Sequence, residues 1–229
     1  MAQPLRCASC SERDLVNRDL TFSDLESVQD FGTFVGRAKH VDADGAIRLQ
    51  AMGEVLASWV RVLPGQGLTN QGLTLGLRVM PLMGEHSLET TVALAGLADR
   101  FARRSSVGSV SATVDVPPQE APAAWTALTP PRSGWEPVEE IDSALLKEVA
   151  TQGIAAVAHG TPDVAGAAAV AALRQRVWGV AMTGSQGTPA AAAFAAYSLG
   201  FLTPGQAATV HSNGPWRRLS TTRGHVLTR

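Results

Sequence analysis

The sequence predicts an α+β protein, with an antiparallel, β-rich N-terminal part and a helical C-terminal part that ends in a β-hairpin or meander. Apolar residues recur at helical spacing before about residue 40, and between residues 46 and 116 most segments alternate with a period of two. Helical spacing returns from residue 139 onward. The chain of 229 residues is 45% hydrophobic, which suffices for a buried core.

These changes of pattern divide the chain into four predicted segments. Residues 1–20 are polar and weakly patterned, so we expect a flexible arm. Residues 21–116 form the predicted α+β domain, and residues 138–229 form a helical domain with a terminal β-ribbon. Between them, residues 117–137 contain six prolines and two tryptophans. Because disordered linkers are poor in aromatic residues, this segment is predicted to be a strap whose tryptophans dock on the domains.

The first domain is expected to begin with a helix that starts near Thr21 or Ser23 and ends near His40. Five strands and one short helix follow. The strands are predicted where apolar and polar residues alternate, over 46–51, 55–63, 73–80, 88–94 and 110–116. The helix covers residues 95–104, directly after the fourth strand. Gly53 and Glu54 are predicted to form a hairpin turn, and Pro81 is predicted to end the third strand.

The second domain is expected to contain three helices, at residues 139–158, 164–182 and 190–202. The last of these has a face of alanines, which favours close helix packing. The terminal ribbon covers residues 211–229. Turn residues at 212–215 and 221–224 predict that it folds back on itself twice.

Charge is distributed unevenly along the chain. The formal net charge is −1, but residues 1–163 contain all twenty acids and thirteen of the basic residues, a net charge of −7. Residues 164–229 carry six arginines and no acid, a net charge of +6. Such a segment indicates either an alanine-rich helical core with few surface positions for acids or a surface that meets an anion. The ribbon arginines can alternatively dock on acids of the first domain.

The terminal ribbon is therefore the predicted functional site. We expect a non-enzymatic binding or assembly module whose ribbon contacts an anionic protein surface, a nucleotide or a nucleic acid. Its candidate binding residues are basic or aromatic side chains, namely Arg217, Arg218, Arg223, His211, His225 and Trp216. Neither a catalytic residue nor a cofactor is predicted, and the sequence does not indicate an oligomeric state.

Two alternatives remain. Three helices followed by a β-ribbon is the order of a winged-helix nucleic-acid-binding protein, although the helix at 190–202 has no basic or amide side chain to read bases. The other alternative is an enzyme with a pocket between the domains. His211 and His225 on neighbouring strands, with Ser220, form a conceivable hydrolase-like cluster, but no acid follows Asp163 in this segment to orient them.

Cys7 and Cys10 form a single Cys-x-x-Cys pair, which is half of a zinc site without the other half. No metal is therefore predicted, and the role of the pair stays open. Two cysteines exclude a disulfide scaffold, and no signal peptide or membrane span is apparent. We therefore expect a protein of the cytoplasm that does not contact the membrane.

One sequence pattern resembles a known group. It includes Gly214, Trp216 and the run Arg218-Leu219-Ser220-Thr221, followed by Arg223-Gly224-His225-Val226-Leu227. Upstream it includes Gly134-Trp135-Glu136-Pro137 and Arg174-x-Arg176-Val177-Trp178-Gly179. The pattern resembles a group of uncharacterised actinobacterial proteins over most of the chain beyond residue 20. This resemblance implies no activity.

Overall fold

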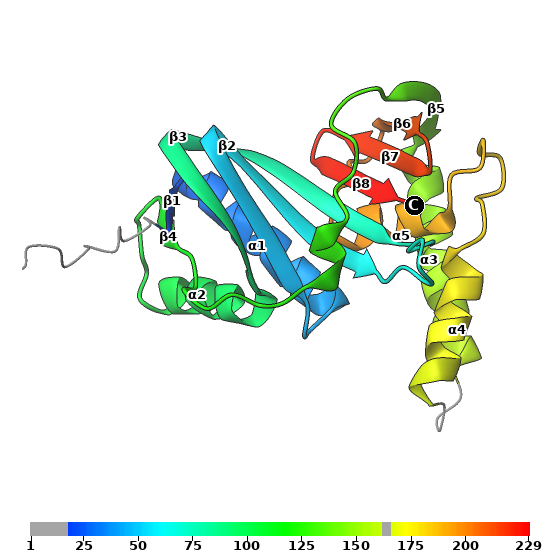
Figure 1. Cartoon of the computed structure of the whole chain (residues 1–229), viewed down its shortest axis with the longest axis horizontal. Helices are drawn as coiled ribbons and strands as arrows, with labels where there is room; N and C mark the ends of the chain where they lie inside the picture. The colour runs from blue at the N-terminus through cyan, green and yellow to red at the C-terminus, as the bar shows by residue number, and fades with distance from the viewer. Residues whose placement is uncertain (1–17, 162–165) are drawn as a thin grey trace, which may run out of the picture.

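The computed structural model describes residues 18–161 and 166–229, and a six-stranded antiparallel sheet joins the two halves of the chain (Figure 1). Its strand order is β2-β3-β8-β7-β6-β5, with bounds β2 (Ala46–Leu63), β3 (Thr74–Ala93), β5 (Glu136–Asp142), β6 (Ala207–Asn213), β7 (Trp216–Thr221) and β8 (Gly224–Thr228). A two-stranded sheet pairs β1 (Asp19–Thr21) with β4 (Thr113–Asp115). The helices are α1 (Leu25–Val41), α2 (Leu94–Ser106), α3 (Ser143–Gly160), α4 (Ala167–Trp178) and α5 (Ala190–Ser198). The predicted α+β class is confirmed.

Helix α1 begins at Leu25, slightly later than the predicted start near Thr21 or Ser23, and Thr21 belongs to β1. Asp24 is its N-cap, and its carboxylate accepts a hydrogen bond of 2.7 Å from the backbone N–H of Ser27. This hydrogen bond lowers the pKa of Asp24 below its usual value. The helix buries Phe31, Phe34 and Val35 against the sheet.

The predicted pairs of short strands are instead two long strands, and this corrects the sequence prediction. β2 runs without interruption from residue 46 to residue 63, because Gly53 and Glu54 form a β-bulge rather than a hairpin turn. β3 likewise continues through Pro81, which pairs with Val55 beside the bulge. Proline is tolerated there because β8 pairs only with Thr74–Leu77, so no β8 partner requires a hydrogen bond from Pro81.

The helix predicted at 139–158 is also corrected. Its first residues belong to β5, which pairs with β6 at the edge of the sheet, and α3 begins only at Ser143. Asp142 sets this boundary, because its carboxylate accepts a hydrogen bond of 2.7 Å from the N–H of Ala144. β5 carries four acids, so the acid-free ribbon lies beside an acidic strand. Three other predicted elements are shorter than expected, with α4 ending at Trp178, α5 at Ser198 and β4 covering residues 113–115 only.

Two hydrophobic clusters lie on opposite faces of the sheet. The larger contains residues of both predicted domains, and Phe34 of α1 stacks on Phe201 after α5 with a centroid distance of 5.9 Å. The smaller lies under the strap, which crosses the sheet and contains the 3₁₀ helix η1 (Ala124–Ala127) (Figure 1). Trp125 of the strap is 7% exposed in this cluster. Cys7, Cys10, most of the predicted arm and the start of the helix predicted at 164 lie outside the described residues.

Candidate anion-binding site

The six predicted ribbon residues do not form one surface. Successive residues of a strand point to opposite faces of the sheet, so neighbouring arginines of β7 separate. Trp216 packs in the cluster under the strap, whereas Leu219 packs in the larger cluster on the helical face. Arg218 therefore lies on the strap face and Arg217 on the helical face.

Arg218 is part of the packing under the strap. Its guanidinium carbon lies 4.6 Å from the ring centroid of Trp135. Burial lowers the pKa of Arg218 from its usual value, and its Nε has no hydrogen-bond partner among the described residues. Trp216 is 5% exposed in the same cluster. These two residues are therefore held by the fold rather than offered to a partner.

Arg217 lies on the helical face beside Gly187. A Cβ atom at Gly187 would be 3.1 Å from Nη2 of Arg217, so the guanidinium packs closely against the backbone. Within the described residues, Nη1 of Arg217 is buried without a hydrogen-bond partner. Arg217 is thus also unavailable to form an open basic surface with Arg223.

Both ribbon histidines lie on the strap face. His211 pairs across the strands with Arg218, and in the described part of the chain its buried Nδ1 has no hydrogen-bond partner. His225 is paired with Ser220, with 2.9 Å between Nδ1 and Oγ. Burial, and to a smaller extent the charge of Arg218, lowers the pKa of His225. No carboxylate is hydrogen-bonded to His225 within the described ranges, so nothing there orients it as a catalytic base.

Arg223 differs from the other ribbon arginines because it stands in the turn between β7 and β8. Its Nη2 lies 3.6 Å from a carboxylate oxygen of Asp30 on α1. The other oxygen of Asp30 accepts a hydrogen bond from Arg78, which also donates to the backbone carbonyl of Arg223. This turn therefore docks on an acid of the first half of the chain, while the Arg223 side chain remains 46% exposed.

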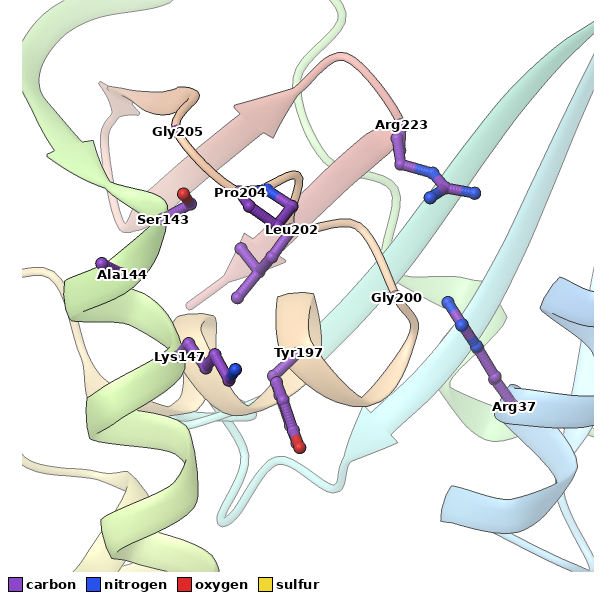
Figure 2. A pocket seen from close by; sticks show the side chains of 10 residues that line it. All are labelled: Arg37, Ser143, Ala144, Lys147, Tyr197, Gly200, Leu202, Pro204, Gly205 and Arg223. Carbon is purple, nitrogen blue, oxygen red and sulfur yellow. The ribbon is translucent and has the colours of Figure 1, made fainter.

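Arg223 also lines a pocket of about 450 Å³ where α1, α3, α5 and the ribbon meet (Figure 2). Arg37 of α1 and Lys147 of α3 are the other two cations of this basic pocket. Figure 2 shows Arg37 and Arg223 extending toward each other from α1 and from the ribbon. The lining residues, none of which is acidic, are Arg37, Ser143, Ala144, Lys147, Tyr197, Gly200, Leu202, Pro204, Gly205 and Arg223.

The end of α5 positions Arg37. Its Nη1 donates a hydrogen bond of 3.4 Å to the carbonyl of Leu199, one of the last carbonyls of that helix. Gly200 follows with a φ of +72°, and a Cβ atom at this residue would overlap the guanidinium of Arg37 at 1.1 Å. Glycine is therefore required both by the backbone conformation and by the close approach of Arg37.

Two hydroxyl groups complete the basic pocket. Ser143, the first residue of α3, is 6% exposed, and its Oγ has no hydrogen-bond partner among the described residues. Tyr197 of α5 is 38% exposed although it is a large aromatic residue. The positive end of the α3 dipole lies at the same place. Three cations, two hydroxyls and a helix N-terminus together form an environment that favours an anion.

Sequence reasoning identified Arg223 but missed Arg37, Lys147 and Tyr197. These residues stand far apart in the chain and belong to no motif, and only the packing of α1 against α5 brings Arg37 to the ribbon. One signal was present, because Lys147 is one of only two lysines. That signal does not reveal where the side chain points.

The structure also bears on the winged-helix alternative. The helix that would enter a DNA groove is α5, and its residues 190–196 are all buried. It packs against α3 and against strands β3 and β8. A buried helix presents no face to base edges, so the geometry does not favour this alternative.

Two family models match the chain, one after the other. Residues 16–125 match the model described as Domain of unknown function (DUF8010), and residues 130–229 match the model described as Domain of unknown function (DUF8185). No curated protein matches the chain. The basic pocket draws on both matched regions, since Arg37 lies in the first and Lys147 and Arg223 lie in the second.

The described residues give two further negative findings. No helix in them has both the length and the apolar character needed to span a bilayer. They also contain no group of three or more histidine, cysteine or acidic side chains placed to hold a metal ion.

Proposed function

We propose that this protein is a non-enzymatic binding module that holds an anionic group of its partner in the basic pocket. The convergence of Arg37, Lys147 and Arg223 from three separate elements on one pocket without a lining acid carries the proposal. Arg223 keeps the role that the sequence suggested for it. Arg217 and Arg218 are assigned to the packing of the sheet instead.

The chemistry of the pocket favours a phosphorylated group. Arg223 shares the single carboxylate of Asp30 with Arg78, so positive charge remains in excess beside Arg37. An anion between Arg37 and Arg223 is attracted by that excess. Arginine binds phosphate with paired hydrogen bonds, whereas Lys147 contributes a mobile point charge. The exposed Tyr197 supplies an additional hydroxyl donor. The volume of about 450 Å³ is within the usual range for small-ligand sites, so the anion can carry an organic body.

Thermal unfolding in the presence of phenyl phosphate tests this proposal. A ligand that binds only the folded protein raises the midpoint of unfolding, and we expect such a rise at low salt and a smaller one at high salt. The Lys147→Gln variant should lose most of the rise. Lys39→Gln is the matched control, because Lys39 is the other lysine, also lies on a helix and does not line the pocket.

The outcomes separate the competing functions. An equal rise in wild type, Lys147→Gln and Lys39→Gln, or no rise in any of them, would overturn the proposal. Salt-sensitive retardation of single- or double-stranded DNA that persists in Lys147→Gln would favour the nucleic-acid alternative. Release of phenol from phenyl phosphate would favour an enzyme.

A further inference from the structure

A second cavity, here called the α4 groove, lies outside the basic pocket and shares no lining residue with it. Its volume is about 1110 Å³. It lies between α4, the end of β2 with the following loop, the start of α5 and the end of β8.

The floor of the α4 groove is apolar. Val62, Leu63 and Ala191 are buried beneath it, and so is Trp178 at the end of α4. The indole of Trp178 stacks on Phe194, with a centroid distance of 4.4 Å and an interplanar angle of 22°. The closest approach of α3 is at Gly153, where a Cβ atom would be 2.3 Å from the indole. These contacts bury the indole, which is 2% exposed, and hold it rigidly beneath the floor of the groove.

The rim of the α4 groove is cationic. Four arginines line it, namely Arg61, Arg174, Arg176 and Arg229, together with a single acid, Asp42. Asp42 pairs with Arg61 at 2.9 Å and is therefore already neutralised. Over residues 18–161 and 166–229, no ion pair with a carboxylate involves Arg174 or Arg176. An apolar floor with unpaired guanidinium groups at its edge is complementary to a molecule that has an apolar part and an anionic part.

We propose that the α4 groove binds an amphipathic organic anion, with its apolar body on the apolar floor of the groove and its anionic head at Arg174 and Arg176. An acyl carboxylate has this chemistry. The apolar body gains from leaving water, in proportion to the area that it buries. The guanidinium groups select an anionic head over a neutral or cationic one.

Calorimetric titration with three ligands of equal chain length tests the assignment. Decanoate, decanol and decyltrimethylammonium each carry a ten-carbon chain, and their heads are anionic, neutral and cationic. The two ionic ligands are used below their micelle concentrations and decanol below its solubility limit. We expect decanoate to bind best. The double variant Arg174→Gln, Arg176→Gln should weaken decanoate binding by about tenfold or more and change decanol binding by less than about twofold.

Further variants keep the result decisive. Ala171→Glu places an acid at an exposed helical position of the groove and should also weaken decanoate binding. Lys147→Gln changes the separate basic pocket and should leave decanoate binding unchanged. The proposals for the basic pocket and for the α4 groove can therefore fail independently. Absence of decanoate binding to wild type, equal affinity for decyltrimethylammonium, or undiminished affinity in the double variant would each overturn the assignment.

Discussion

The half-buried arginines of β7 and the exposed cations of the basic pocket have the same formal charge but opposite roles. Arg217 and Arg218 lie within the packing on the two faces of the sheet, where atoms of their guanidinium groups have no polar partner among the described residues. Arg37, Lys147 and Arg223 extend into a pocket that contains no lining acid. The density of positive charge in a sequence therefore does not show where that charge is accessible. Accessibility depends on which face of the sheet each arginine points to and on whether the strap covers that face.

The strap face should be the more sensitive region to truncation. Trp216→Ala removes a buried indole from the cluster under the strap and should lower the free energy of unfolding by about 3–5 kcal/mol. Tyr197→Ala in the basic pocket removes an exposed ring and should cost less than about 1 kcal/mol. Urea denaturation of both variants measures the difference. Similar losses of unfolding free energy in the two variants would contradict the expected difference between the strap face and the basic pocket.

Gly200→Ala should damage the pocket and the fold together. The new Cβ atom meets the guanidinium of Arg37, and the left-handed backbone disfavours alanine. We expect a loss of about 1–3 kcal/mol in stability and weaker binding of phenyl phosphate. Gly84→Ala is a matched control, because φ is +79° there, no atom lies within 4 Å of the new Cβ, and Gly84 does not line the basic pocket. Unimpaired phenyl phosphate binding in Gly200→Ala would show that Arg37 does not need its observed position.

Two arginine substitutions sharpen the contrast in stability. Arg218→Gln loses the contact with Trp135 and should cost about 1 kcal/mol. Arg223→Gln loses an exposed ion pair with Asp30 and should cost less than about 0.5 kcal/mol. Chemical denaturation of each variant at the same ionic strength gives these values. A larger cost for Arg223→Gln would mean that docking on Asp30 is its main role.

The smallest expected effect concerns pH. The pKa of His225 is lowered in the folded protein, so the unfolded chain binds its proton more readily. The neutral ring therefore contributes stability above the ordinary histidine pKa of 6.5, and this contribution is lost as pH falls from there toward the lowered folded value. Replacing His225 with Gln should flatten the stability profile in that window. An unchanged profile, measured by denaturation at several pH values, would contradict the burial of His225.

Much of the fold followed from periodicity and turn residues, and the failures have physical causes. Helix α1 and the terminal strands have local signals, namely the Asp24 cap and glycine turns. The continuity of β2 and β3 has no such local signal, because Gly53 and Pro81 are residues that usually end strands. The strands continue only because these residues lie close to each other at a β-bulge. β5 was missed because its acidic residues extend the helical pattern of α3. The basic pocket was missed because its cations meet only through tertiary contacts.

Titration calorimetry with phenyl phosphate tests the central claim most directly, by comparing Arg223→Gln with Arg218→Gln. Arg223, which is exposed and lines the pocket, should matter for binding, and the half-buried Arg218 should not. We predict that Arg223→Gln weakens binding about tenfold, whereas Arg218→Gln, still folded, changes it by less than about twofold. The reverse order, or equal affinity for both variants and wild type, would contradict the assignment of the basic pocket.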